Sequence, residues 1–186
     1  MMLRLLIHAA FYPSLWFNRL MCALGLWHQA DWVDGHVAIG SLPSRADLAR
    51  LKAEGVTAVV NLCEEFAGDA ATLAELGLEQ LHLPTMDYHC PAEDDLRRGL
   101  VFIDDRIAQG GKVLAHCKAG RGRSAILVLC YLMMRKGIHA DDALAILKRV
   151  RPGIARGIKR HQAVRSIERS ARQQIGSYRM VLPPRP

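Results

Sequence analysis

The segment from Lys112 to Met134 constrains the fold more than any other, because it joins an apolar strand to a helix through a short loop. Lys112–His116 is predicted to be a strand. Ala125–Met134 is apolar on every face, which predicts a central helix that is buried all round. The chain is therefore expected to place the intervening loop at the end of a buried strand, directly before the start of a buried helix.

Strands and helices alternate along the rest of the chain. Alternation of this kind predicts an α/β domain of three layers, with a central, largely parallel sheet flanked by helices. The 186 residues suffice for one domain, expected over residues 31–175, and residues 176–186 end in prolines and are expected to be loose. The other predicted strands are a pair within Trp32–Gly40, Val56–Cys63 and Leu78–Leu83, and the other predicted helices are Ser44–Glu54, Ala70–Leu76, Ala92–Gln109, Ala140–Arg151 and Lys159–Ile175.

The loop between strand and helix has the composition of an anion-binding site. Its two glycines let the backbone curl so that several amide hydrogens point at one spot, and the following helix adds its positive end. The same field favours the thiolate of Cys117 over the thiol. Arg123, six residues later, can return over the loop and bind two phosphate oxygens. We therefore expect Cys117 to be a nucleophile rather than an inert buried thiol, and the residues that bind phosphate to be Lys118, Ala119, Gly120, Arg121 and Gly122.

The stretch from His116 to Ser124 resembles the signature of the protein tyrosine phosphatase superfamily, a cysteine and an arginine separated by five residues. The resemblance implies a dual-specificity type of phosphatase that needs no metal or other cofactor. It implies that Cys117 forms a phosphocysteine intermediate and that Arg123 stabilises the transferred phosphoryl group. It also implies that Ser124 assists departure of the thiolate.

The resemblance further implies an aspartate that protonates the leaving oxygen and later activates water. Asp87 precedes Cys117 by 30 residues and lies in a loop after a predicted strand. The alternatives are Asp94 and Asp95, although acids at these positions also favour the first turn of a helix. A role for Asp87 as a solvated loop residue is the remaining interpretation.

Within the superfamily, the chain is similar to the mitochondrial-type phosphatidylglycerophosphate phosphatases and their bacterial relatives. The similarity covers roughly residues 11–170 and includes Phe-Tyr-Pro at 11–13, Ile-Gly-Ser-Leu-Pro at 39–43 and Glu-Glu-Phe at 64–66. It implies an anionic phospholipid substrate such as phosphatidylglycerophosphate. The acid loop, residues 86–90, departs from that group because it lacks a glycine soon after the acid.

Two basic residues of the loop, Lys118 and Arg121, fit a substrate with additional negative charge. The alternative is that they form a solvated face or pair with acids such as Glu64 and Glu65. A phosphatase that acts on phosphoproteins is the nearest competing function. A rhodanese-type sulfurtransferase and a catalytically silent phosphate-binding adaptor are the more distant ones.

Residues 1–30 are apolar and aromatic and carry only Arg4 and Arg19 as full charges. The uncharged run of 14 residues from Leu5 to Asn18 is interrupted by His8 and Pro13, and it falls short of the roughly 20 residues of a spanning helix. We expect this segment to lie on a membrane surface, which would place the protein in the cytoplasm, peripheral on the inner face of a membrane. Packing on the domain and a cleaved leader are the alternatives.

The formal net charge of +7 indicates acidic partners, and no pattern typical of nucleic-acid binding is present. The five cysteines are odd in number and scattered, which favours a reducing compartment. Cys90 is a candidate for a regulatory disulfide with Cys117, against the simpler interpretation of an ordinary thiol. Gln162 is a candidate for positioning the hydrolytic water, against a solvated role. The histidines show no metal-ligand spacing, and the sequence leaves the oligomeric state open.

Overall fold

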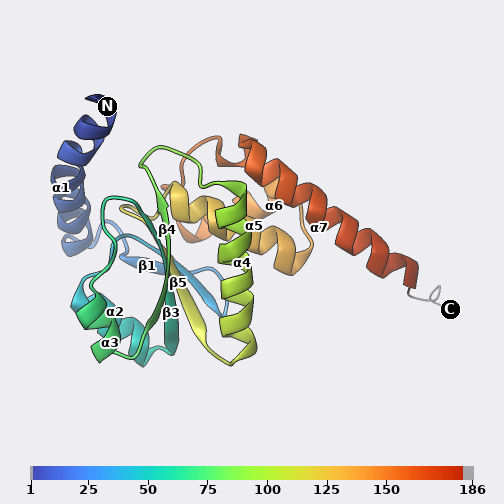
Figure 1. Cartoon of the computed structure of the whole chain (residues 1–186), viewed down its shortest axis with the longest axis horizontal. Coiled ribbons are helices and arrows are strands. Elements are labelled where there is room, and N and C mark those ends of the chain that lie inside the picture. Colours follow the sequence, from blue (N-terminus) through green and yellow to red (C-terminus); the bar gives the residue numbers. More distant parts are fainter. Residues whose placement is uncertain (1, 182–186) are drawn as a thin grey trace.

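The computed structural model describes residues 2–181, with side chains for residues 11–173. Within this range the strands are β1 (Ala30–Trp32), β2 (Val37–Gly40), β3 (Val56–Cys63), β4 (Glu79–Thr85) and β5 (Lys112–His116). They form one sheet in the order β1-β2-β5-β3-β4. β1 runs antiparallel to β2, and the other neighbours are parallel (Figure 1). The predicted α/β class with a largely parallel sheet is confirmed.

Helices cover both faces of this sheet (Figure 1). One face carries α4, α5, α6 and α7, and the other carries the short helices α2 and α3. The three predicted layers are therefore present. The bounds are α2 (Arg45–Ala53), α3 (Ala70–Glu75), α4 (Glu93–Ala108), α5 (Arg123–Lys136), α6 (Ala140–Val150) and α7 (Gln162–Val181), with a 3₁₀ turn at Ile158–Arg160.

Alternate residues of the central strands fill two separate cores because successive side chains of a strand point to opposite faces. Val60 and Leu62 of β3 pack toward α5. Val59 of β3 and Leu114 of β5 pack on the opposite face with Leu51 of α2. Since β5 lies between β2 and β3, the residue after its last position emerges in the middle of the sheet.

The predicted start and end of α2 are also observed. The Oγ of Ser44 accepts a hydrogen bond from the Asp47 N–H at 3.2 Å, and the Asp47 carboxylate accepts one from the Ser44 N–H at 2.9 Å. This reciprocal pair satisfies two N–H groups that the helix itself leaves free. Gly55 follows the helix with φ +98°, a left-handed conformation that glycine adopts without strain.

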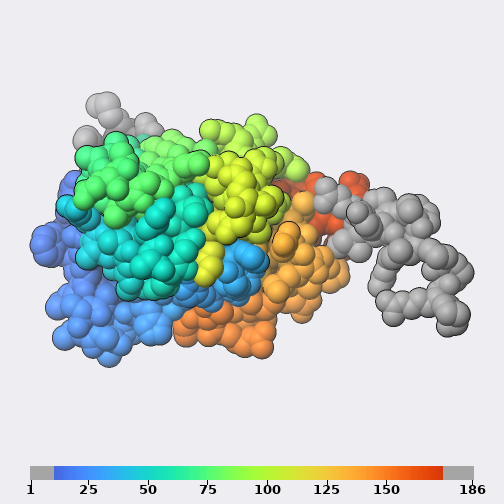
Figure 2. Space-filling model, turned by 90° about the horizontal axis from the view of Figure 1, so that it is seen from below, coloured from blue at the N-terminus to red at the C-terminus, as the bar shows by residue number. Residues whose placement is uncertain are grey.

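The amino-terminal segment forms one long helix, α1 (Met2–Ala23), which runs through Pro13 rather than stopping there. Phe11 and Leu15 on one face are buried in the main core. On the other face Trp16 and Phe17 are 67% and 54% exposed. In Figure 2 the blue amino-terminal residues lie beside the cyan surface that includes α2. The segment therefore packs on the domain through one face and exposes an apolar face on the other.

The carboxy-terminal helix differs from the expectation. α7 begins at Gln162 and continues to Val181, so residues 176–181 of the tail that was expected to be loose are helical. The physical reason is that Pro183 is the first proline after Gly176, so the helix continues through that single glycine. Residues 182–186 lie outside the described part. Over residues 2–181, no helix combines the length and the hydropathy that crossing a bilayer requires.

Candidate active site

Cys117 is the first residue after β5, and its sulfur lies at the centre of the loop that leads into α5. The Gly120 N–H donates to Sγ with N and S 3.3 Å apart, and the Ser124 hydroxyl is within 3.4 Å of the same sulfur. Gly120 has φ +69°, which turns its N–H inward. The loop therefore directs two hydrogen-bond donors, one backbone N–H and one hydroxyl, at the sulfur.

These donors outweigh the cost of burying a charge at Cys117. Burial acts to raise the pKa of the thiol, but the Arg123 guanidinium, the Ser124 hydroxyl and N–H and the Gly120 N–H together lower it below its ordinary value. The other four cysteines behave differently, because burial raises the pKa of each. Cys117 is therefore the thiol that ionises most readily.

Arg123 is the first residue of α5 and is 2% exposed. Its Nη1 donates to Glu65 Oε2 and to the Thr85 carbonyl, both at 2.7 Å. Burial acts to lower the guanidinium pKa, but the negative charge of Cys117, with the Glu65 hydrogen bond and Asp87, raises it overall. Nε and Nη2 are buried and donate no hydrogen bond to a described protein group. Nε and Nη2 form the edge of the fork that is suited to two oxygens of a phosphate.

Asp87 lies in the loop after β4 and reaches back to the cradle. Its Oδ1 is 3.1 Å from Nη2 of Arg123, and its Oδ2 forms an ion pair with Nζ of Lys118. The Asp87 N–H donates to Glu65 at 3.2 Å, so the loop and the arginine share one acidic partner. The carboxylate is thereby held next to the position that a phosphate on the Arg123 fork would occupy.

The two alternative acids, Asp94 and Asp95, lie outside the cavity above Cys117. Asp94 and Asp95 lie in the first turn of α4, where their charge favours the helix N-terminus, and Asp95 pairs with Arg98 at 3.0 Å. Neither of them lines the cavity above Cys117.

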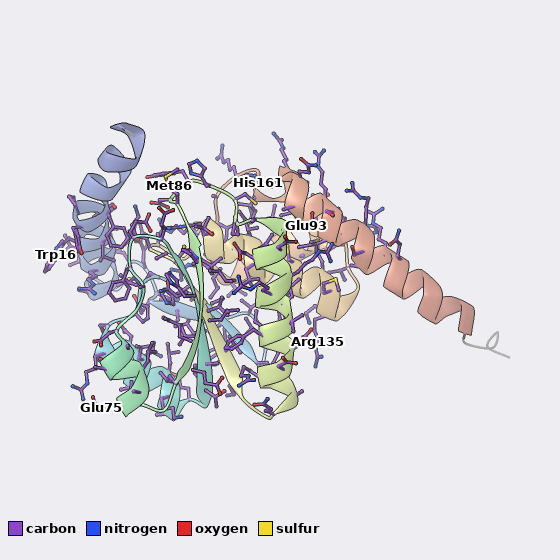
Figure 3. The ribbon with its side chains drawn as sticks, in the orientation of Figure 1. Trp16, Glu75, Met86, Glu93, Arg135 and His161 are labelled. Atoms are coloured by element: carbon purple, nitrogen blue, oxygen red, sulfur yellow. The ribbon has the colours of Figure 1, made fainter. Side chains whose placement is uncertain are left out.

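A cavity of about 460 Å³ opens above the sulfur. It is lined by Ser14 and Asn18 of α1, by Asp87 and Tyr88 of the acid loop, and by the residues that lead into α7. Figure 3 shows Met86 and His161 at the same end of the molecule, on the two loops that border this opening. The wall contributed by α1 could not be located from sequence alone, because it depends on how that helix packs.

The two additional basic residues of the loop have different surroundings. The Lys118 side chain is 8% exposed and pairs with Asp87, not with Glu64 or Glu65, so a solvated loop face is wrong for it. Its ammonium also lies 5.8 Å from the centre of the Phe11 ring.

Arg121 stacks on Trp27 with 3.6 Å between its guanidinium carbon and the ring centre. It is half-buried and lines the cavity. Arg121 is therefore held in place by an aromatic ring rather than by an acid.

Gln162 and Cys90, the two minor candidates from the sequence, do not line the cavity above Cys117. Gln162 is exposed at the start of α7 and does not line the cavity, whereas its neighbour His161 does. Cys90 likewise lies outside the lining of this cavity, and burial raises the pKa of its thiol to about 11. Over the described residues, no cluster of three His, Cys, Asp or Glu side chains suits a metal ion.

Two charged residues of the site escaped the sequence reasoning. The sequence suggests Glu65 as part of the Glu-Glu-Phe motif and as a partner of Lys118 or Arg121, whereas in the structure it is 1% exposed and binds Arg123. Arg151 follows α6 and donates to the Ala119 carbonyl from outside the cradle at 3.0 Å. The signal for both was weak, since a charged residue after a strand or a helix is usually solvated.

The sequence of the chain is similar to that of known phosphatases. Residues 37–170 match the family described as the dual specificity phosphatase catalytic domain. A phosphatidylglycerophosphate phosphatase from Arabidopsis thaliana, PTPMT2, is 33% identical over 151 residues, which cover 77% of this chain and 65% of that protein. The chain spans 48% of the related Arabidopsis PTPMT1. The human phosphatidylglycerophosphatase and protein-tyrosine phosphatase 1 is 31% identical over 78% of each chain.

Solved structures agree with the sequence comparison. The crystal structure of PTPMT1 in complex with PI(5)P superposes with a TM-score of 0.69 at 26% identity, covering 81% of this chain and 99% of the other. The active form of Tk-PTP gives a TM-score of 0.67 at 29% identity, covering 80% and 99%. The chain therefore belongs to the dual specificity phosphatases, a family of cysteine-dependent phosphomonoester hydrolases.

Proposed function

We propose that the chain hydrolyses a phosphomonoester through a phosphocysteine intermediate on Cys117. The observation that carries the proposal is the Nε and Nη2 edge of the Arg123 fork, which is buried beside a sulfur whose pKa is lowered. Among the described residues, Nη2 of this edge forms an ion pair with Asp87 alone. A cation and a ring of N–H donors around a thiolate favour a dianion at that point. Such an arrangement suits transfer of a phosphoryl group to sulfur.

The geometry supports a two-step mechanism. Cys117 Sγ attacks phosphorus while Arg123 holds two of its oxygens, and Asp87 gives a proton to the ester oxygen as the P–O bond breaks. Water then attacks the phosphocysteine and passes a proton to Asp87. The Ser124 hydroxyl, 3.4 Å from the sulfur, donates to the thiolate as the S–P bond breaks.

The ion pairs of Asp87 explain how substrate binding makes this residue available as the general acid. Without a substrate, its carboxylate is the counterion of Lys118 and Arg123. A phosphate dianion on the Arg123 fork supplies the negative charge that these two cations require. Asp87 is then free to take up a proton from solvent and to deliver it to the leaving oxygen.

For the substrate, we propose an anionic phospholipid such as phosphatidylglycerophosphate. The names of the plant and mammalian relatives support this class. Lys118 and Arg121 line the cavity beside Arg123 and add positive charge for a second anionic group. The human relative's name also includes protein-tyrosine phosphatase, so a phosphoprotein substrate is the rival that the experiment must exclude.

We further propose that the exposed face of α1 rests on an anionic membrane, with the protein peripheral on its inner, cytoplasmic face. Trp16, Phe17 and Leu20 are each more than half exposed on that face, and Figure 3 shows Trp16 pointing away from the domain. Ser14 and Asn18 of the same helix line the cavity above Cys117. A lipid headgroup at the surface would thus lie close to the catalytic cavity.

The nucleophile is tested by Cys117→Ser, with release of phosphate from p-nitrophenyl phosphate as the readout. Loss of turnover is expected, because a serine hydroxyl is not ionised near neutral pH. The matched control is Cys22→Ser, at a half-buried thiol on α1 outside the cavity lining. Turnover at the wild-type rate in Cys117→Ser would remove the assignment.

The substrate class is tested by comparing kcat/KM for phosphatidylglycerophosphate, phosphoinositides and phosphopeptides with one enzyme preparation. We expect phosphatidylglycerophosphate to be preferred. A phosphopeptide preference would defeat the lipid assignment but leave the mechanism intact.

Membrane binding is tested by flotation with vesicles that contain phosphatidylglycerol. Burying a large apolar side chain contributes about 1.5–3 kcal/mol. Replacing both Trp16 and Leu20 by Ser is therefore expected to weaken binding by about 100-fold or more. Val101→Ser on α4 removes an equally exposed apolar residue and serves as the control. Equal flotation of both variants would contradict the proposal.

A further inference from the structure

Arg151 lies on the outer side of the Cys117 loop and is 7% exposed. Its Nη1 donates to Asp31 Oδ2 at 2.5 Å and to the His28 carbonyl at 3.2 Å, and its Nη2 donates to the Ala119 carbonyl at 3.0 Å. One buried guanidinium thus joins three segments that are far apart in the sequence. Asp31 is almost as buried as Arg151 and balances its charge.

The bond to Ala119 determines the orientation of one peptide group in the cradle. The carbonyl of the Ala119–Gly120 peptide accepts from Arg151, and the N–H of the same peptide donates to Cys117 Sγ. In a planar trans peptide the C=O and the N–H point in opposite directions. Holding the carbonyl outward therefore holds the N–H inward. Rotation of this peptide would replace a donor at the sulfur by a carbonyl oxygen.

The neighbouring carbonyls of the loop are also fixed from outside, but by backbone donors. The Leu42 N–H donates to the Lys118 carbonyl at 3.2 Å, and the Ala155 N–H donates to the Arg121 carbonyl at 2.8 Å. Among these three outward carbonyls, the one of Ala119 depends on a side chain. A single substitution at Arg151 can therefore change the orientation of this part of the loop without replacing a residue that faces the anion.

The space behind this peptide is fully occupied. A Cβ on Gly120 would lie 2.6 Å from the Gly40 carbonyl oxygen and 2.9 Å from Nη2 of Arg151. The peptide is thus confined between β2 and the arginine. Removing the guanidinium would open this space and allow the peptide to rotate.

We propose that Arg151 is a positioning residue for the phosphoryl transfer proposed above, acting by holding the Ala119–Gly120 peptide with its N–H directed at the anion site. The inference rests on the proposed function of Cys117. Arg151 acts through the loop and does not contact the reacting atoms.

The test compares Arg151→Met, which keeps most of the side-chain volume, with Arg151→Lys and with the control Arg106→Met. Arg106 on α4 forms an ion pair with Glu79 at 2.6 Å and stacks on Phe102, on an element that does not line the cavity. The readouts are the pH profile of Cys117 alkylation, inhibition by inorganic phosphate, and kcat/KM for p-nitrophenyl phosphate.

For Arg151→Met we expect the pH midpoint of alkylation to rise by about one unit, because one donor to a thiolate is lost. Weaker inhibition by phosphate, by about tenfold, and a fall in kcat/KM of about 100-fold are expected with it. Arg151→Lys should recover part of each effect, since an ammonium can reach the Ala119 carbonyl but lacks the fork that also holds Asp31. Arg106→Met should lower the unfolding midpoint and leave all three readouts unchanged.

A different set of results would overturn the inference. A lower unfolding midpoint for Arg151→Met, with the wild-type alkylation profile and phosphate inhibition, would show that Arg151 only stabilises the fold. If Arg151→Met does not fold, Asp31→Asn replaces it. This change releases the guanidinium from its carboxylate, and a raised alkylation midpoint would support the inference while an unchanged one would overturn it. Turnover in Cys117→Ser would instead defeat the proposed function, independently of Arg151.

Discussion

His116, directly before the nucleophile, is expected to make the fold sensitive to mild acid. It is 2% exposed, and its Nδ1 has no hydrogen-bond partner among the described residues. Burial, together with the charge of Arg123, lowers its pKa to about 3 although a hydrogen bond with Cys117 acts the other way. The folded protein therefore holds a neutral imidazole, whereas the unfolded chain takes up a proton below about pH 6.5.

The sign and size of the effect follow from this difference. Because the unfolded state binds the additional proton, stability falls as the pH falls below 6.5, and the loss continues until the folded state is protonated near pH 3. Between pH 7.5 and 5.5 the contribution of His116 is about 1.4 kcal/mol of unfolding free energy. The value is insensitive to the folded-state pKa, since pH 5.5 is well above it.

Urea unfolding at pH 7.5 and 5.5 measures this contribution when wild type is compared with His116→Asn, which cannot titrate. The variant is expected to lose less stability on acidification than wild type, by about 1.4 kcal/mol. His36→Asn, at an exposed histidine, is the control and should keep the wild-type pH dependence. Equal acid sensitivity of wild type and His116→Asn would refute the reasoning that His116 is held neutral.

Three further substitutions probe the site. Ser124→Ala removes a donor to the Cys117 sulfur and is expected to raise the thiolate midpoint by about 1–2 units, read from ultraviolet absorbance below pH 9; an unchanged midpoint would deny the hydroxyl this role. Asp87→Asn is expected to lower kcat by about 10²–10⁴-fold and to preserve inhibition by inorganic phosphate, and normal turnover would exclude Asp87 as the acid. Glu65→Gln breaks a fully buried ion pair with Arg123 and is expected to cost about 3–5 kcal/mol in urea unfolding, whereas a loss below about 1 kcal/mol would show that the pair is replaceable.

The parts of the fold that were predictable are those that local pattern determines. Strand β3 has the predicted bounds, Val56–Cys63, because its apolar residues are bounded by Gly55 and by acids. Helix α5 was predictable because ten successive residues, Ala125–Met134, leave no polar face for solvent. The loop between β5 and α5 followed from the same local pattern together with its glycines.

The parts that were not predictable depend on contacts between distant residues. Asp31 and Arg151 are 120 residues apart, and each alone is indistinguishable from a solvated charge. The same is true of Glu65 and Arg123, which are 58 residues apart. The sequence predicts an interruption at Pro13, but α1 continues through it because Phe11 and Leu15 pack into the core, and tertiary burial outweighs local propensity.

The loop around the Cys117 sulfur is held by residues that lie far apart in the sequence, and this has a consequence for the newly synthesised chain. The groups that hold the loop around Cys117 come from β2, from the residue after α6 and from the turn that precedes α7, so the surroundings are complete only when nearly the whole chain has folded. A chain still emerging from the ribosome carries an ordinary thiol at this position, protonated near neutral pH and slow to react with peroxides or alkylating agents. Chemical reactivity at Cys117 is thus expected to report completed folding.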